Sequence, residues 1–196
     1  MNYHKTVPGW FNFQDLYSEI VRDSQDGDIL VEVGVFLGKS LAYLVETSTQ
    51  QGKKPQIYAV DLFEISPDHG DGAMPWDENA REWEKKNGGK DALWNEYNKY
   101  MAGLPNKELI KNSFRENSWD AAAHFEDGSV SFVFIDASHL YENTKRDVES
   151  WYPKMKKGGI MAGHDFNQGV EKAVMEFFPN KNLRVSRYGD CWVVLV

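Results

Sequence analysis

This 196-residue sequence has little cysteine and no excess of basic over acidic residues. The single cysteine, Cys191, cannot form a disulfide within the chain, so nothing in the sequence requires an oxidising compartment. The chain has 22 Lys and Arg against 30 Asp and Glu, which gives a formal net charge of −8. Binding to a phosphate backbone depends on a basic surface, so we expect no nucleic-acid partner.

Long apolar runs are also missing. No stretch approaches the ~20 residues that span a bilayer, and residues 1–13 are too aromatic and interrupted for a signal peptide. We therefore expect a soluble, cytoplasmic protein without a membrane partner. Hydrophobic residues make up 41% and charged residues 27%, which is typical of a globular chain, and the length fits one domain over residues 1–196.

Apolar segments alternate with segments of helical periodicity along most of the chain. Strands are predicted at 29–33, 56–63, 108–112, 130–135 and 160–162, and helices at 40–46, 141–155 and 170–178, the second stopped by Lys157-Gly158-Gly159. This alternation indicates a doubly wound α/β sheet of parallel strands joined by right-handed crossovers. Segments 183–188 and 191–196 flank Gly189-Asp190, which predicts an antiparallel hairpin with a two-residue turn.

The stretch 65–103 is too long for a simple connection. It is rich in Trp and Tyr, and short helices are predicted around residues 77–86 and 90–101. Two interpretations stay open for this insert. It could form a lid, or cap, over a site, or it could thicken the fold or make a dimer contact.

A glycine-containing loop, Glu32-Val-Gly34-Val-Phe36-Leu-Gly38-Lys-Ser40, follows the first predicted strand and begins the first predicted helix. Gly34 permits a sharp turn, Gly38 would let the backbone approach a ligand, and the N–H groups at the helix start favour an anion. The dinucleotide fingerprint has glycine where Phe36 stands, so a ligand without a diphosphate is favoured. The alternative is an ordinary strand-to-helix turn.

Acidic and imidazole side chains follow the predicted strands. Asp61 ends the second strand, where a carboxylate can accept both hydroxyls of a ribose, although Asp also commonly caps turns. Asp136 ends the fourth strand, His139 lies three residues later, and His164-Asp165 end the fifth. Because neighbouring parallel strands lie about 5 Å apart, these last four groups should converge.

Carboxylates mixed with imidazoles suit a divalent cation, Mg²⁺ before Mn²⁺ or Zn²⁺. A cation lowers the pKa of a coordinated hydroxyl, and a nearby His can accept the proton. The alternative is structural: His139 would pack against Tyr141, and His164-Asp165 would cap the strand and the next helix. We also expect Asp147 to lie on a solvated helix face, and Trp10, Phe11 and Phe13 either to dock on the core or to line an acceptor pocket.

Four sequence blocks carry a resemblance to a known family. They are the glycine loop, Val60-Asp61, Phe134-Ile-Asp-Ala-Ser-His-Leu-Tyr141 and Gly158-Gly-Ile-Met-Ala-Gly-His-Asp-Phe166. Together they resemble class I S-adenosylmethionine-dependent methyltransferases, most closely the macrolide-sugar O-methyltransferase and cephalosporin-hydroxylase-like group. The resemblance spans roughly residues 28–178. It implies S-adenosylmethionine as cofactor and a Rossmann-like, seven-stranded, mostly parallel sheet with a C-terminal antiparallel hairpin.

The resemblance also implies roles for individual residues. Glu32 and Gly34 would lie near the methionine end of the cofactor, Asp61 on its ribose, and Asn117-Ser118 beside adenine, where the family often has Gly-Asp-Ser in place of Glu116-Asn-Ser118. The full set implied for the cofactor is Glu32, Gly34, Phe36, Gly38, Ser40, Asp61, Asn117, Ser118 and Asp136. Asp136, His164 and Asp165 would hold the metal, although the family commonly has an acid or amide at the His164 position. Asp136 and His139 would be catalytic, with His139 as the base.

The predicted function is therefore methyl transfer from S-adenosylmethionine to a hydroxyl of a small molecule, a sugar or a phenolic compound, assisted by Mg²⁺ or Mn²⁺. Two alternatives stay open: a metal-independent N-methyltransferase, and a non-catalytic nucleoside-binding protein of the same fold. The small-molecule acceptor is not identified by the sequence. Whether the chain forms a homo-oligomer is also open.

Overall fold

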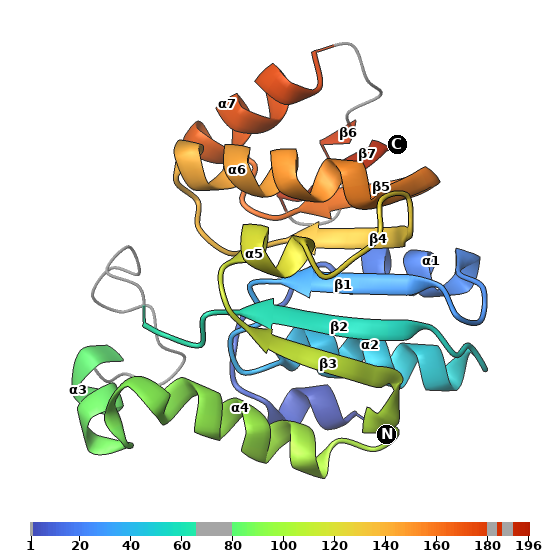
Figure 1. The fold of residues 1–196 in the computed structure, drawn as a ribbon. Helices are drawn as coiled ribbons and strands as arrows, with labels where there is room; N and C mark the ends of the chain where they lie inside the picture. Colours follow the sequence, from blue (N-terminus) through green and yellow to red (C-terminus); the bar gives the residue numbers. More distant parts are fainter. Residues whose placement is uncertain (1, 66–79, 180–183, 186–189) are drawn as a thin grey trace.

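The computed structural model describes residues 2–65, 80–179, 184–185 and 190–196. Its strands form one sheet in the order β3-β2-β1-β4-β5-β7-β6 (Figure 1). Neighbouring strands from β3 to β5 pair in parallel, and β7 pairs antiparallel with both β5 and β6. The strands are β1 (Ile29–Val33), β2 (Gln56–Asp61), β3 (Ile110–Arg115), β4 (Val130–Ile135), β5 (Met155–Gly163), β6 (Arg184–Val185) and β7 (Trp192–Leu195). The predicted mostly parallel, doubly wound α/β fold with an antiparallel end is confirmed.

Helices cover both faces of the sheet. In Figure 1, α5 and α6 lie in front of the sheet and α1 and α2 behind it. The α-helices are α1 (Gln14–Asp23), α2 (Lys39–Gln50), α3 (Ala80–Lys86), α4 (Ala92–Gly103), α5 (Ser118–Ala122), α6 (Tyr141–Trp151) and α7 (Gln168–Phe177). Short 3₁₀ turns are η1 (Tyr3–Thr6), η2 (Gly89–Asp91), η3 (Lys107–Leu109) and η4 (Tyr152–Lys154). Among the described residues, no helix combines the length and the apolar character that a membrane crossing requires.

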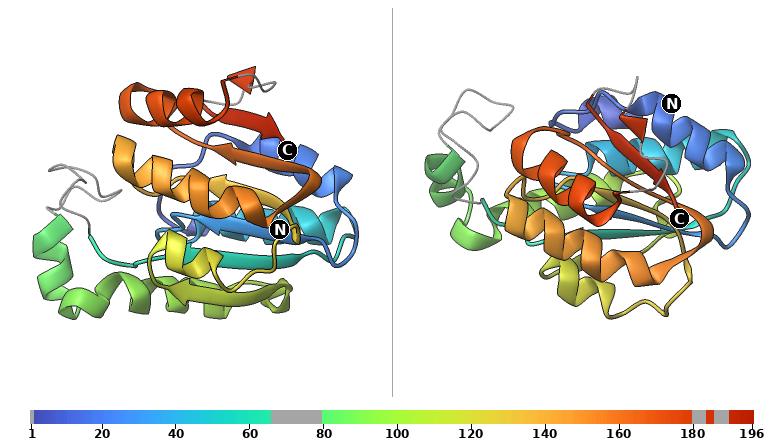
Figure 2. Two further views of the ribbon diagram at one scale, coloured as in Figure 1. Left: turned by 45° about the horizontal axis from the view of Figure 1, so that its top comes forward. Right: turned by 90° about the horizontal axis from the view of Figure 1, so that it is seen from above.

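Alternating side chains of the central strands belong to two separate cores, one on each face of the sheet. Figure 2 shows the helices that lie on the two faces. Leu30 of β1 and Phe132 of β4 join the cluster with α1, α2 and α4. Val31 and Val133, the next residue of each strand, join the cluster with α5, α6 and α7. This is the period of two expected for strands buried on both faces, and it fixes which loop residues can face the strand ends.

The start of β5 differs from the prediction of a helix over 141–155. Helix α6 ends at Trp151 and passes into the 3₁₀ turn η4, because Pro153 lacks the amide hydrogen that would continue the α-helical bonds. Gly158 has a φ of +79° and lies within β5, where the pairing with β4 shifts register. The glycine pair therefore forms a strand irregularity rather than a helix stop.

The hairpin at the end of the chain is present in a different register. A two-residue turn at Gly189-Asp190 would pair Val185 with Val194, but Val185 pairs with Trp192. The shift by two residues keeps every side chain on the same face, so fully buried Trp192 stays in the core. The predicted turn falls partly on residues 186–189, which lie outside the described residues.

The long connection between β2 and β3 contains the two predicted helices as α3 and α4. Tyr97 and Met101 of α4 are buried, and the Tyr97 hydroxyl lies 2.6 Å from the Ser113 hydroxyl on β3. Helix α4 is thus the crossover helix that joins β2 to β3, packed into the core. Residues 66–79 of the same connection lie outside the described residues.

Candidate functional site

Strands β1, β2, β4 and β5 end at one edge of the sheet, the side to which their arrowheads point in Figure 1. Backbone hydrogen bonds continue past the strand ends. The Asp136 N–H donates to the Val33 carbonyl at 2.8 Å, and the His164 N–H donates to the Ile135 carbonyl at 3.1 Å. The loops that carry the predicted site residues are therefore held side by side by the sheet itself.

Gly34 lies where the loops after β1 and β4 touch. Its φ is +86°, and a Cβ atom there would lie 2.0 Å from the Asp136 carbonyl oxygen. Any side chain would force the two loops apart. The sequence predicted a sharp turn at Gly34, and the structure adds close contact with the residue that begins the acid–imidazole cluster.

Gly38 has a different environment from the one predicted. It has a φ of +87°, and a Cβ atom would lie 2.6 Å from Met101 Cε and 3.2 Å from the Tyr97 ring. The side that a Cβ would occupy is thus filled by α4. Packing of the crossover helix explains the glycine without any ligand.

Asp61 holds the loops after β1 and β2 through backbone hydrogen bonds. The Phe36 N–H donates to Oδ2 at 2.8 Å, and the Phe63 N–H donates to Oδ1 at 2.7 Å. Both phenylalanines have positive φ, +52° and +50°, a conformation that is strained for a side chain of this size. The turn-capping interpretation of Asp61 is therefore observed, and ribose binding stays a prediction.

Glu32 lies beneath the glycine loop, with only 1% of its surface exposed. Its Oε1 accepts a hydrogen bond from the buried Ser40 hydroxyl of α2. Burial raises the pKa of Glu32 to about 8, and the bond from Ser40 offsets only part of this effect. The predicted cofactor residues Glu32 and Ser40 are thus bonded to each other inside the protein.

Asn117 and Ser118 begin α5. The Asn117 amide donates to Asp120 Oδ2 at 3.1 Å, and the buried Ser118 hydroxyl accepts a hydrogen bond from Trp151 Nε1 at 2.8 Å. Asp147 of α6 is also buried, at 2% exposure, so the expectation of a solvated face is wrong. Residues 147 and 151 share one side of α6, so Asp147 lies on the same side as Trp151, whose Nε1 donates to Ser118.

The four predicted acid and imidazole groups converge. His139 Nε2 lies 3.2 Å from Asp165 Oδ2 and 3.5 Å from Asp136 Oδ1. His164 Nδ1 lies 3.1 Å from Asp165 Oδ2 and 4.0 Å from Asp136 Oδ1. We call Asp136, His139, His164 and Asp165 the acid–imidazole cluster. Their convergence is observed, and their role as cation ligands stays a prediction.

Electrostatics within the cluster favour charged groups. A hydrogen bond to Asp136 raises the pKa of His139, and the nearby Asp165 charge adds to the effect. Burial opposes the charged form of His164, but Asp165 and Asp136 outweigh it, so the pKa of His164 is raised too. The hydrogen bond from His164 lowers the pKa of Asp165. The surroundings therefore favour the charged forms of both imidazoles and of Asp165.

The donor set fits a divalent cation. One ligand atom from each of Asp136, His139 and Asp165 lies within 4.8 Å of the others. This trio contains His139, where the resemblance implied His164 and gave His139 the role of base. Two imidazoles thus flank the same carboxylates, and either could provide the nitrogen ligand.

The N-terminal segment reaches this edge as well. Lys39 Nζ donates to the Gly9 carbonyl at 2.9 Å, the Trp10 ring lies 5.9 Å from the Phe36 ring, and Asn12 Oδ1 lies 2.9 Å from His164 Nε2. Sequence reasoning missed Asn12. Its spacing from His164 carries no periodic or motif signal, so only the tertiary structure brings the two together.

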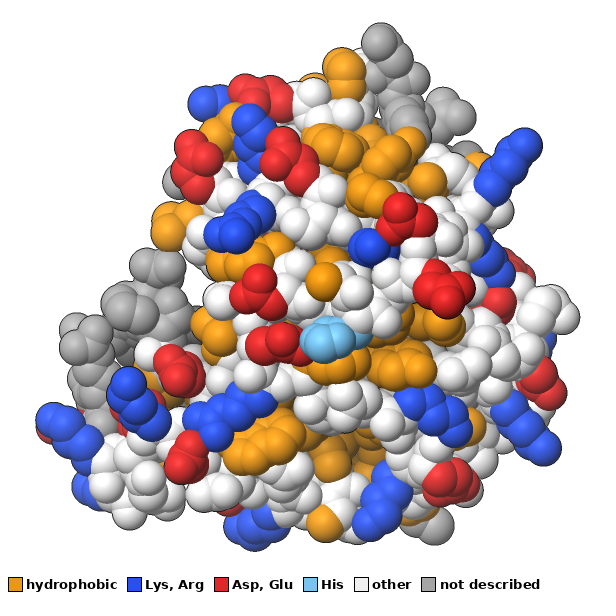
Figure 3. All heavy atoms as spheres, viewed as in Figure 1, with side chains coloured by type: hydrophobic (Ala, Val, Ile, Leu, Met, Phe, Trp, Pro, Cys, Tyr) orange, Lys and Arg blue, Asp and Glu red, His pale blue; other side chains and the backbone are white. Residues whose placement is uncertain are grey.

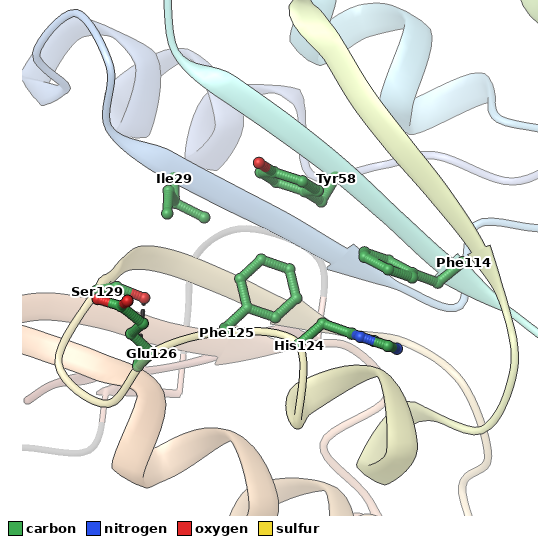
Figure 4. A pocket seen from close by; sticks show the side chains of 7 residues that line it. All are labelled: Ile29, Tyr58, Phe114, His124, Phe125, Glu126 and Ser129. Atoms are coloured by element: carbon green, nitrogen blue, oxygen red, sulfur yellow. Dashed lines mark hydrogen bonds between the residues drawn. The ribbon is translucent and has the colours of Figure 1, made fainter.

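A hollow of about 210 Å³ lies elsewhere, on the sheet face next to α5. Figure 4 shows Tyr58, Phe114 and Phe125 turned toward one another there. It arises because five-residue α5 covers little of β2 and β3. Figure 3 shows this face of the molecule, where apolar patches are interspersed with charges of both signs. The hollow contains none of the predicted site residues.

Comparison with known proteins places the chain in a family. Residues 31–166 match the model of a methyltransferase domain. The chain therefore belongs to this family, whose fold takes S-adenosylmethionine as its cofactor, and the resemblance to class I methyltransferases is confirmed. A curated relative, the uncharacterized protein y4gI of Sinorhizobium fredii, is 31% identical over 69 residues, which are 35% of this chain and 8% of that protein.

Solved structures show the same fold. The calicheamicin methyltransferase CalS11 matches with a TM-score of 0.61 and 16% identity over 93% of this chain and 76% of that one. The O-methyltransferase NovP matches with a TM-score of 0.61 and 18% identity, over 93% and 78% of the two chains. Cofactor-bound Rv0187 from MTB matches with a TM-score of 0.60 and 11% identity, over 99% and 86%.

Proposed function

We propose that this chain is an O-methyltransferase that moves a methyl group from S-adenosylmethionine to a hydroxyl of a small molecule, a sugar or a phenol. We further propose that Mg²⁺ or Mn²⁺ assists the transfer. The observation that carries the proposal is the convergence of the acid–imidazole cluster beside Gly34, at the carboxyl ends of the parallel strands, where sheets of this class bind their ligands. O-methyltransferases among the structural neighbours support the choice of oxygen as acceptor atom.

The chain's own residues fit the cofactor. Helix α2 starts at Lys39 with Gly38 as its N-cap, and no side-chain hydrogen bond from the described residues caps it, so its first N–H groups can receive a carboxylate. Asp61 fixes the backbone of the glycine loop through Phe36, which sets the position of that helix start. In this role Asp61 would orient the donor, and its carboxylate would accept the ribose hydroxyls.

The cluster fits acceptor activation. Asp136 and Asp165 would hold the cation with one of the two imidazoles, and the bound cation would lower the pKa of a coordinated hydroxyl. The His139 side chain is 48% exposed and faces both carboxylates, so it can reach an acceptor and take its proton. Its raised pKa makes the neutral imidazole a stronger base.

Titration calorimetry tests the proposal with S-adenosylhomocysteine, Mg²⁺ and Mn²⁺. We expect the nucleoside to bind the wild type, Asp61→Asn to weaken that binding, and Asp136→Asn to weaken cation binding. Asp127→Asn, at an exposed carboxylate paired with Lys154, is the control and should change neither. Nucleoside binding with no cation binding would overturn the metal-assisted mechanism and favour metal-independent transfer. Absence of both would overturn the methyltransferase itself.

A further inference from the structure

His164 is held from two sides by the N-terminal segment. Its Nε2 lies 2.9 Å from Asn12 Oδ1, and its ring lies 5.3 Å from the Phe13 ring. The opposite nitrogen, Nδ1, faces Asp165 and Asp136. The His164 side chain is 16% exposed, against 48% for His139. Of the two imidazoles in the cluster, His164 is therefore the one whose orientation is fixed.

The chemistry of the two nitrogens follows from their partners. Nδ1 faces two carboxylates, so it must carry either a proton or a cation. The Asn12 Oδ1 atom 2.9 Å from Nε2 can only accept, so Nε2 carries a hydrogen, and Nδ1 is then protonated only in the charged imidazolium. Histidines that bind metals usually donate their other N–H to such an oxygen, which fixes the tautomer and the ring orientation.

Resting on the proposed function, we infer that Asn12 is a positioning residue that presents Nδ1 of His164 to a divalent cation beside Asp136 and Asp165. This assigns different tasks to the two imidazoles. His164 is the nitrogen ligand, and the more exposed His139 stays available to take a proton. The N-terminal segment thereby becomes part of the cation site.

A purely structural role for Asn12 would be to anchor the segment. The segment has other anchors, however: Lys39 holds the Gly9 carbonyl, and Glu46 accepts hydrogen bonds from Tyr3 and His4. Gln14 also donates to the Phe11 carbonyl at 3.0 Å, next to Asn12 but without a bond to His164. Loss of the Asn12 amide should therefore leave the segment in place.

The test uses the full chain with Mn²⁺ alone, followed by titration calorimetry. Asn12→Leu keeps the size but removes the acceptor, and we expect it to weaken Mn²⁺ binding by about tenfold or more. Asn12→Asp keeps an acceptor oxygen, and Gln14→Ala removes only a neighbouring bond. Both variants should therefore retain at least about one third of the wild-type affinity for Mn²⁺. Wild-type affinity in Asn12→Leu would overturn the inference.

Nuclear magnetic resonance of ¹⁵N-labelled histidines gives a readout that needs no metal. At pH 6, the metal-free wild type should show a slowly exchanging Nε2–H signal from His164, assigned by its loss in His164→Gln. The signal should disappear in Asn12→Leu and persist in Gln14→Ala. If the wild type fails to bind Mn²⁺, the metal part of the proposed function fails. An unchanged His164 signal in Asn12→Leu overturns the role of Asn12 in either case.

Discussion

Asp147 offers a quantitative test of the buried chemistry away from the candidate site. Its Oδ1 is buried without a hydrogen-bond partner among the described residues. Burial raises its pKa from 3.8 to about 7, against the opposing effects of Ser118 and Arg146. The folded state therefore binds this proton more tightly than the unfolded chain does. Stability from this group is fully present below pH 3.8 and is lost as the pH rises to about 7.

The difference in pKa corresponds to about 4 kcal/mol of unfolding free energy once the pH exceeds both values. Asp147→Asn removes the ionisation and keeps an oxygen that can bond to Ser118. Between pH 5 and pH 8, the unfolding free energy of the variant relative to the wild type should rise by about 3 kcal/mol. This is less than the full difference, because part of the wild-type stability is already lost below pH 5. Urea unfolding followed by circular dichroism at both pH values measures it.

Other groups titrate over the same range, but they are shared by both proteins and cancel in the difference. Asp127→Asn, at a carboxylate that is 74% exposed, serves as the control. The difference in unfolding free energy between this variant and the wild type should not change with pH. If the difference for Asp147→Asn is equally flat, the carboxyl of Asp147 is not held protonated by burial, and the reasoning is refuted.

Three further predictions concern the glycine loop. Glu32→Gln should raise the unfolding free energy by about 3 kcal/mol at pH 7, because the pKa of Glu32 is about 8 in the folded state; a denaturant midpoint at or below that of the wild type would contradict this. Gly38→Ala should lower the unfolding free energy by about 2–4 kcal/mol, because the φ of Gly38 is +87° and a Cβ atom there would contact Met101. A melting temperature within error of the wild type would contradict this. Asp61→Asn should lower the unfolding free energy by about 1–3 kcal/mol, because an amide has one acceptor oxygen for the two backbone N–H groups. Unchanged calorimetric stability would show that the loop does not depend on these two hydrogen bonds.

The parts of the fold that the sequence predicted well are those set by local pattern. The bounds of β1 and β4 match the predicted ranges, because each is a short, continuous apolar run ending at Gly34 or Asp136. The convergence of the acid–imidazole cluster followed from the same fact, since adjacent parallel strands end at a common edge. Methyltransferase family membership rested on these motifs and was confirmed by the domain match.

The parts that the sequence could not predict depend on contacts between distant segments. Gly38 is explained by Met101, a residue of the crossover helix that no local pattern places beside the loop. Asp147 is buried because it shares a helix face with Trp151, and a charged residue type alone indicates exposure. Asn12 meets His164 across most of the chain length. In each case the deciding partner lies outside the motif.

In the proposed function, the close approach of Gly34 to Asp136 bears on how donor and acceptor would be brought together. The glycine loop and the acid–imidazole cluster touch through backbone atoms. They follow β1 and β4, which pair in parallel with Val33 opposite Ile135. Neither can move without disturbing the central strands, whose side chains belong to both cores. In the proposed function, the sheet would therefore set the distance between a donor on the loop and a hydroxyl at the cluster. Changes in the surrounding helices should alter which acceptor enters, and leave that distance unchanged.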